Sequence, residues 1–135
     1  HILVLNSDLF TNINVEEIYL NLINNNADMA IASKDFNVDI PYAVFDNNDN
    51  VINSFTEKPS LRYYSSAGIY LLKKEFLDQI PENTFYNITD LMDKLIDNGQ
   101  KLIHVPIRGF WIDIGNSIQY NKAKEMAQYL KWKML

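Results

Sequence analysis

Residues 2–9 read Ile2-Leu3-Val4-Leu5-Asn6-Ser7-Asp8-Leu9, in which four apolar residues precede a short polar stretch with one acidic residue. A continuous apolar run of this length is typical of a strand that is covered on both faces, as in a parallel sheet. Open α/β sheets bind their ligands beyond the carboxyl ends of the strands. The stretch therefore predicts an α/β fold, with Asp8 as a candidate functional carboxylate at the end of the first strand.

The same arrangement recurs twice further along the chain, in Phe55-Thr56-Glu57-Lys58-Pro59 and in Phe110-Trp111-Ile112-Asp113-Ile114-Gly115. Apolar and β-branched residues predict strands in seven places. These are Ile2–Leu5, Met29–Ala32, Tyr42–Phe45, Val51–Phe55, Ala67–Leu72, Leu102–Val105 and Trp111–Ile114. The polar residues 46–50 lie between two of these strands and predict the tip of a hairpin.

Helical spacing of apolar residues predicts three helices between the strands. The first has its apolar stripe at Val15, Ile18, Tyr19, Leu22 and Ile23, with Asn14 as its N-cap and Glu17 as the reciprocal partner of that cap. The second has Ile88, Leu91, Met92, Leu95 and Ile96, and Gly99 stands where a left-handed C-cap belongs. The third begins at Ser117 and is expected to turn Tyr120, Ala123, Ala127 and Leu130 inward.

Composition narrows the classes of protein to consider. The 135 residues fit one compact domain, and their net charge of -5 argues against nucleic acid as the main partner, because phosphate backbones are held by clustered Lys and Arg. No apolar run approaches the roughly 20 residues that a membrane-spanning helix needs. The chain has no cysteine, which suits a reducing compartment, so we expect a cytoplasmic protein without a membrane partner.

Together with Ser66-Ala67-Gly68-Ile69-Tyr70, the three acidic stretches resemble the sugar-1-phosphate nucleotidyltransferases, which join a nucleoside triphosphate to a sugar 1-phosphate. The resemblance covers nearly the whole chain and implies a Rossmann-like α/β fold of the nucleotide-diphospho-sugar transferase type, with a mixed, mainly parallel sheet flanked by helices. The Gly-rich, Arg-containing nucleotide loop that opens this family is absent from residues 1–135. We therefore expect a single partial domain, the C-terminal, sugar-phosphate-binding half, whose N-terminal part is missing.

Nucleotidyl transfer brings two anionic phosphates together, and a bridging Mg²⁺ is the usual means of neutralising both. Mg²⁺ takes oxygen ligands and is often held by one or two protein carboxylates. Asp8 and Asp113 both belong to strand ends and are the natural pair, and the resemblance implies the same metal role for them. Without a metal, two carboxylates about 4 Å apart repel each other by roughly 4 kcal/mol at an effective dielectric constant of 20.

The remaining site residues are predicted to bind the sugar 1-phosphate. Lys58 resembles the family lysine that holds the phosphate, and Glu57 can accept hydrogen bonds from sugar hydroxyls. Pro59 is expected to favour an extended Lys58 and to end the strand there. Tyr42-Ala43 stands where the family commonly has Tyr-Gly, and Gly68 is expected to allow a ligand close to the backbone.

Two alternatives remain open at this stage. One is a glycosyltransferase of the related nucleotide-sugar-binding fold, although no Asp-x-Asp pair follows Val4-Leu5. The other is an inactive regulatory homologue, which is compatible with Ala43 and Ser7 in positions where the family has Gly. The expected partners are a nucleoside triphosphate, a sugar 1-phosphate and further copies of the protein, in the synthesis of nucleotide sugars for polysaccharides.

Three other features are interpreted as structural. Trp111 and His104 lie in strand-like runs and are expected to be packed rather than to stack on a ligand or to take part in catalysis. Asp46, Asn48, Asn50 and Glu57 match four positions of a calcium-binding loop, but Val51 replaces the Gly that its sharp turn requires.

Overall fold

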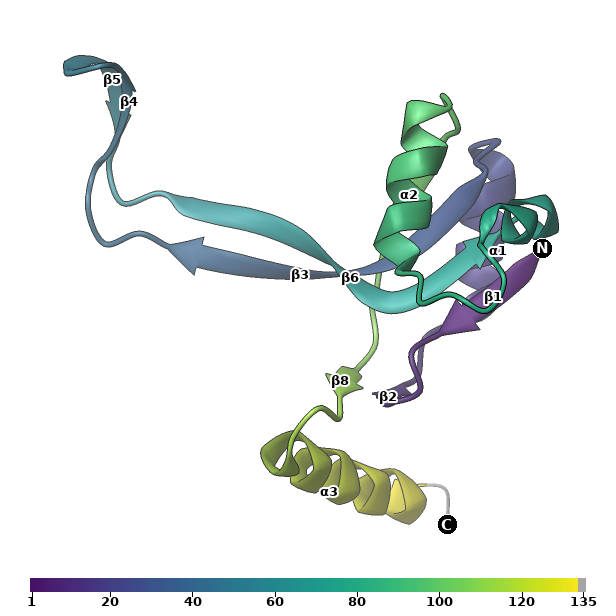
Figure 1. Cartoon of the computed structure of the whole chain (residues 1–135). Coiled ribbons are helices and arrows are strands. Elements are labelled where there is room, and N and C mark those ends of the chain that lie inside the picture. The colour runs from purple at the N-terminus through teal and green to yellow at the C-terminus, as the bar shows by residue number, and fades with distance from the viewer. Residues whose placement is uncertain (134–135) are drawn as a thin grey trace. The chain divides into compact units, whose positions relative to one another are not determined.

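A computed structural model describes the backbone of residues 1–133 and the side chains of residues 1–130. The chain divides into a first unit, His1–Ser33 with Ser66–Leu135, and a second unit, Lys34–Ser65. The structure has the following elements, most of which are labelled in Figure 1. They are β1 (Ile2–Leu5), β2 (Leu9–Thr11), α1 (Val15–Asn24), β3 (Met29–Asp39), β4 (Val44–Asn48), β5 (Val51–Thr56), β6 (Ser60–Leu72), the 3₁₀ helix η1 (Lys74–Gln79), α2 (Ile88–Asp97), β7 (Leu102–Pro106), β8 (Trp111–Asp113) and α3 (Ser117–Lys133).

The main sheet has four strands in the order β1-β6-β3-β7. β3 and β7 run parallel, with Met29 opposite Leu102, whereas β1 runs antiparallel to β6, with Ile2 opposite Leu72. The expected mixed α/β sheet is therefore confirmed. The expectation that the apolar run of β1 lies in a parallel, doubly covered strand is wrong. β1 is an edge strand of the described sheet, and Leu5 is 54% exposed.

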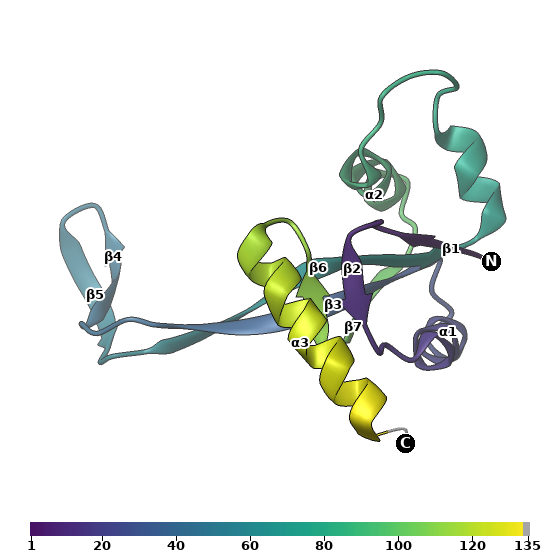
Figure 2. The ribbon, with the colours of Figure 1, turned by 90° about the horizontal axis from the view of Figure 1, so that it is seen from below.

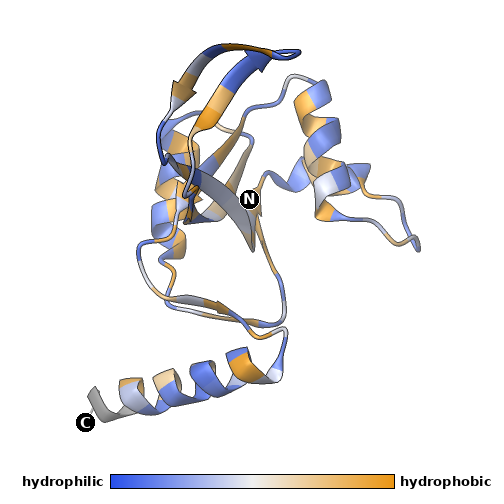
Figure 3. Cartoon of the chain, turned by 90° about the vertical axis from the view of Figure 1, so that its left-hand side faces the viewer, coloured by the Kyte–Doolittle hydropathy of each residue, from blue (hydrophilic) through white to orange (hydrophobic). Residues whose placement is uncertain are grey.

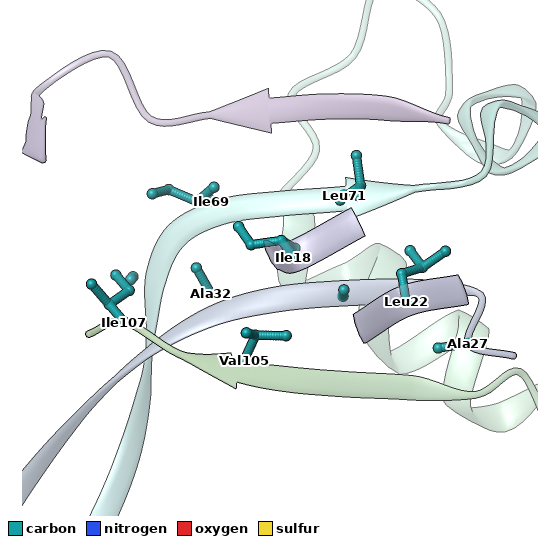
Figure 4. Close-up of a cluster of buried hydrophobic side chains, with 10 residues drawn as sticks. Ile18, Leu22, Ala27, Ala32, Ile69, Leu71, Val105 and Ile107 are labelled. Carbon is teal, nitrogen blue, oxygen red and sulfur yellow. The ribbon is translucent and has the colours of Figure 1, made fainter. Parts of the chain in front are cut away.

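Helices cover both faces of the sheet in the first unit, as Figure 2 shows for α1 and α2. Ile18 and Leu22 of α1 pack on alternate residues of β3, β6 and β7, which form the cluster drawn in Figure 4. Leu91 and Leu95 of α2 pack with Phe76 of η1 on the opposite set of strand residues. Alternation along the strands thus sends half of each strand's apolar side chains to either helix layer.

The first two helices follow the predicted pattern closely. The side chain of Asn14 accepts hydrogen bonds from the backbone N–H groups of Glu16 and Glu17, which confirms it as the N-cap of α1. Gly99 follows α2 with a φ of +74°, the left-handed conformation that a C-terminal glycine provides. The stripe of α1 is narrower than expected, because Ile18 and Leu22 are buried while Tyr19 is 43% exposed.

The third helix differs from the prediction in its inward face. Asn116 caps the first turn by accepting a hydrogen bond from the backbone of Gln119 at 3.0 Å. Ala123 is buried as expected, but Tyr120 is 57% exposed, so its predicted inward position is wrong. None of the described helices combines the length and the apolar composition that a membrane-crossing segment requires.

The second unit is built from extended chain. β4 and β5 pair antiparallel around Asp49, whose φ is +49°, which confirms the predicted hairpin and rules out the helix-flanked calcium loop. All residues of Lys34–Ser65 are described, and none of them is buried. Figure 3 shows hydrophobic residues interspersed with hydrophilic ones on this hairpin. The second unit therefore has no hydrophobic core of its own.

An ion pair and a backbone hydrogen bond of Asp28 join three strands in the first unit. Lys73 Nζ donates to Asp28 Oδ1 at 2.5 Å, and the backbone N–H of Lys101 donates to Asp28 Oδ2 at 2.8 Å. The hydrogen bond from Lys73 holds the pKa of Asp28 below its ordinary value, and the same bond raises the pKa of Lys73. Asp28 thereby connects β3 to the end of β6 and the start of β7.

We expect Asp28→Asn to lower the free energy of unfolding by about 1 kcal/mol near neutral pH, because it removes the ion pair but keeps an acceptor for Lys101. A lowered Asp28 pKa means that this stabilisation is present above the ordinary Asp pKa and is lost as the pH falls through the lowered value. The contribution of Lys73 is present below the ordinary Lys pKa and is lost as the pH rises through its raised value. Urea unfolding should therefore show a difference between the two proteins near pH 7 that shrinks at about pH 2. An equal difference at both pH values would contradict this linkage.

Candidate active site

The two predicted metal-binding carboxylates belong to neighbouring backbone positions in a small sheet of the first unit. β2 pairs antiparallel with β8, so that Leu9 lies opposite Asp113. One residue beyond this pair, the backbone N–H of Ile114 donates to the carbonyl of Asp8 at 2.8 Å. Residues offset by one position across such a ladder have Cα atoms about 6 Å apart. The structure thus places the backbones of Asp8 and Asp113 close together, from segments that are about 100 residues apart in the chain.

Both carboxylates are available to a ligand. Asp8 lies in the turn before β2, Asp113 ends β8, and both residues are exposed. Neither side chain makes a hydrogen bond or an ion pair with the described residues. No group of three or more His, Cys, Asp or Glu side chains that could hold a metal ion is found among those residues. Two free carboxylates on an open edge fit Mg²⁺, which commonly takes only one or two protein carboxylates and completes its shell with phosphate and water oxygens.

The small β2–β8 sheet is fixed at its other end by local side chains. Thr11 Oγ1 donates to the carbonyl of Phe110 at 2.7 Å, and Asn12 Oδ1 accepts from the backbone N–H of Phe110 at 2.9 Å. Asn12 lies so close to Gly109 that a Cβ there would be 1.9 Å from its Oδ1. Any larger residue at position 109 would therefore have to displace the Asn12 side chain. These contacts hold β2 against β8 at the end opposite the carboxylates.

Gly68 lies in β6 with a φ of +71°, which favours glycine. A Cβ at this position would lie 2.6 Å from Nδ2 of Asn6. The close approach that glycine allows is therefore made here by the side chain of Asn6. Binding of a substrate at Gly68 stays a prediction.

Trp111 and His104 were both expected to be packed, and the structure confirms this only for Trp111. Trp111 is partly buried against the cluster of Figure 4, and its Nε1 donates to the carbonyl of Ala67 at 2.8 Å. This confirms its predicted place in the packing. His104 is exposed on β7, so the expectation of a packed histidine is wrong, and its Nδ1 shares a hydrogen bond of 2.9 Å with the buried Ser33 Oγ.

The four other predicted site residues lie together in the second unit. The backbone N–H of Ile40 donates to the carbonyl of Pro59 at 3.0 Å, and Val44 pairs with Thr56. These two connections join the two strands of an antiparallel ribbon that continues into the β4–β5 hairpin. Between them, residues 41–43 lie opposite residues 57–58. The structure thus brings Tyr42 and Ala43 opposite Glu57 and Lys58, although their segments were identified from separate motifs.

The backbone of Lys58 differs from the prediction. Its φ is +45°, in the left-handed region, so the extended geometry that Pro59 was expected to favour is wrong. Lysine in this region is strained by about 1 kcal/mol, and such strain is concentrated at functional sites. Tyr42 is 74% exposed, and Lys58 and Glu57 are also exposed, so each can meet a ligand. Asp8, Gly68 and Asp113 belong to the first unit.

A cavity of about 230 Å³ lies beside the start of α1. Its lining includes Asn12, Glu17 and Arg108, and Arg108 Nε lies 3.5 Å from Glu17 Oε1. Glu17 thus pairs with Arg108, rather than completing the predicted reciprocal cap of α1. None of the predicted site residues lines this cavity.

Comparison with known proteins supports the resemblance. A family model described as nucleotidyl transferase matches residues 1–129. The UTP–glucose-1-phosphate uridylyltransferase of Synechocystis sp. is 34% identical over 85 residues, which cover 59% of this chain and 22% of that protein. The glucose-1-phosphate adenylyltransferase of Clostridium perfringens is 34% identical over 80 residues, which cover 51% of this chain and 20% of that protein.

The fold has counterparts among solved structures. A Bacillus anthracis protein described as a candidate glucose-1-phosphate thymidylyltransferase, in complex with a sucrose, superimposes with a TM-score of 0.62 at 22% identity. The superposition covers 93% of this chain and 53% of that chain. The matched part therefore spans about half of that solved chain and about a fifth of the two curated relatives.

Proposed function

Because this chain belongs to the nucleotidyl transferase family, we propose that it is the C-terminal, sugar-phosphate-binding half of a sugar-1-phosphate nucleotidyltransferase. The observation that supports the proposal is the closeness of the Asp8 and Asp113 backbones at one end of the β2–β8 pair. Both carboxylates are exposed and without a protein partner among the described residues. The proposed protein acts in the cytoplasm as a homo-oligomer, and its product is a precursor of polysaccharides.

The proposed reaction is a direct displacement. An oxygen of the sugar 1-phosphate attacks the α-phosphorus of the nucleoside triphosphate and forms a new P–O bond. The bond from the α-phosphorus to the bridging oxygen breaks, and pyrophosphate leaves with the electron pair of that bond. No side chain is covalently modified in this scheme, which agrees with a candidate site made of carboxylates and a lysine.

Asp8 and Asp113 would hold Mg²⁺ in this reaction. When bound, the ion neutralises the phosphates and aligns them for displacement. The contribution of the two residues is to supply oxygen ligands of fixed position at an open edge of the first unit. Their separate origins, a turn before β2 and the end of β8, make the pair dependent on the β2–β8 ladder.

Residues of the second unit would bind the sugar 1-phosphate. Lys58 supplies a compact positive charge for the phosphate, and Glu57 accepts hydrogen bonds from sugar hydroxyls. Tyr42 and Ala43 would line the sugar-binding space from the opposite strand of the ribbon. The methyl group of Ala43 would make that space narrower than a glycine would. Gly68 of the first unit is kept as a proposed substrate-binding residue.

The test is product analysis with the intact protein, a panel of nucleoside triphosphates and a panel of sugar 1-phosphates, in the presence of Mg²⁺. We expect pyrophosphate and a nucleotide sugar in equal amounts. A glycosyltransferase would instead consume a nucleotide sugar and release a nucleoside phosphate, and an inactive homologue would release neither product. Either of the last two outcomes would overturn the proposal.

Lys58→Ala should raise the KM for the sugar 1-phosphate by about 10- to 100-fold, because a hydrogen bond to a charged group contributes about 1.5–3 kcal/mol. The KM for the nucleoside triphosphate should change little. Steady-state kinetics with each substrate varied in turn separates the two effects. Lys58→Arg keeps the charge and should recover part of the loss, while Lys124→Ala on the exposed face of α3 serves as the control. Equal changes in both KM values would argue against a sugar-phosphate role for Lys58.

A further inference from the structure

Two consecutive carbonyl groups of β6 anchor the two segments that carry Asp8 and Asp113. The carbonyl of Ala67 accepts the indole N–H of Trp111 at 2.8 Å. The carbonyl of the next residue, Gly68, accepts the backbone N–H of Asn6 at 2.9 Å. Ala67 is fully buried, so its carbonyl belongs to the packed part of β6.

The two residues that donate to these carbonyls, Asn6 and Trp111, have the same sequence spacing from the carboxylate residues. Asn6 precedes Asp8 by two residues, and Trp111 precedes Asp113 by two residues. Since the two carbonyls belong to one dipeptide, the distance between the two anchoring points is fixed by the backbone geometry of β6. The carboxylate pair is thus held from one side by its own β2–β8 ladder and from the other by Ala67 and Gly68.

The side chain of Asn6 adds a steric contact to this anchor. It occupies the space beside Gly68 in which a Cβ would come within 2.6 Å of its Nδ2 and 2.7 Å of its Cγ. The contact is possible only because residue 68 is a glycine. Any side chain there would push Asn6, and with it the turn that carries Asp8, away from β6.

We propose that Asn6 and Trp111 are positioning residues that set the separation of the Asp8 and Asp113 carboxylates through these consecutive carbonyls, and thereby set the affinity and selectivity of the cation site. This inference rests on the function proposed above. Mg²⁺ demands near-ideal octahedral geometry at about 2.1 Å, whereas Ca²⁺ accepts longer and more variable distances. Loosening either anchor therefore weakens the binding of Mg²⁺ more than that of Ca²⁺.

The experiment measures binding of the metal alone to the intact protein. Mn²⁺, which suits the same oxygen ligands, is titrated and its free concentration is followed by electron paramagnetic resonance, and Mg²⁺ and Ca²⁺ are then used as competitors. Trp111→Phe removes the indole N–H but keeps an aromatic ring in the packing. Gly68→Ala forces Asn6 out of place. Each variant should weaken Mn²⁺ binding by about 10-fold or more, as expected for residues that orient metal ligands.

A double variant tests whether Gly68 acts through Asn6. If it does, Asn6→Ala added to Gly68→Ala should restore part of the lost Mn²⁺ binding, because removal of the Asn6 side chain relieves its clash with the new methyl group. Asn25→Ala is the matched control, since its exposed side chain donates to the carbonyl of Asn21 at the end of α1, and it should leave Mn²⁺ binding unchanged. The ratio of the dissociation constants for Mg²⁺ and Ca²⁺ should rise only in the anchor variants.

The outcomes separate this inference from the proposed function. If Asp8→Asn and Asp113→Asn weaken Mn²⁺ binding but the folded anchor variants bind Mn²⁺ with the affinity and selectivity of the unchanged protein, the positioning role is wrong. If the two Asp variants themselves leave Mn²⁺ binding unchanged, the metal site of the proposed function is wrong. A loss of thermal stability in Trp111→Phe without a change in metal affinity would show that Trp111 only packs.

Discussion

Asp8→Asn and Asp113→Asn should each reduce pyrophosphate release by the intact protein by about 10³-fold. An amide keeps the shape of the side chain but removes the charge that holds a divalent cation. Metal ions stabilise the charge of a phosphoryl-transfer transition state by several kcal/mol, and about 4 kcal/mol corresponds to a factor of about 10³ in rate. Initial rates at saturating concentrations of both substrates measure this effect.

The fold should tolerate both changes. Asp8 and Asp113 are exposed, and their side chains make no hydrogen bond or ion pair with the described residues, so unfolding midpoints should remain within a few degrees of the unchanged protein. Asp97→Asn at the end of α2 removes an exposed carboxylate elsewhere in the first unit and should leave the rate unchanged. Full activity in either site variant would exclude that residue as an essential metal ligand.

The elements with local signals could be predicted from the sequence. Asn14 and Gly99 mark the ends of helices because capping depends on the residue itself and on a few neighbours along the chain. The strand Ile2–Leu5 has the predicted bounds. Its antiparallel pairing with β6 could not be predicted, because a short apolar run fits a parallel and an antiparallel neighbour equally well.

The elements that depend on distant partners were missed. β2 has only three residues and no alternation of its own, and it exists as a strand because it pairs with β8, about 100 residues later. β3 continues to Asp39 through polar residues, beyond the predicted end at Ala32. The positive φ of Lys58 contradicts the local preference imposed by Pro59, so the structure of the ribbon overrides that preference.

The candidate site likewise contains residues that the sequence could identify and residues that only the tertiary structure reveals. Acidic residues after strand-like runs identified Asp8 and Asp113, because metal chemistry restricts the residue types that can serve. Asn6 and Asn12 gave no such signal, since asparagine is abundant in this chain and suits turns, caps and exposed positions alike. Their importance appears only where Gly68 and Gly109 leave space for them, and that pairing is a property of the tertiary structure.

We expect the 135-residue chain to self-associate at micromolar concentration. Two surfaces support this expectation. The edge strand β1 has unpaired backbone groups on its free side within the described sheet, and Leu3 and Leu5 are 37% and 54% exposed. The second unit exposes large apolar side chains along its length, among them Phe45 (54%), Val51 (67%) and Phe55 (65%). Edge strands and apolar patches of this kind favour association with another chain.

The magnitude of the apolar contribution is comparable with the cost of association, which is about 4–15 kcal/mol. Burial of about 400 Å² of apolar surface contributes roughly 10 kcal/mol before the loss of translational and rotational freedom is subtracted. Light scattering across a range of concentrations measures the mass directly. Leu3→Lys with Leu5→Lys places charges on the edge strand and should shift the mass toward that of the monomer, whereas Leu20→Lys, on the exposed side of α1, should not. A monomer at all concentrations would contradict the expectation, because the exposed surfaces would then be stable in water.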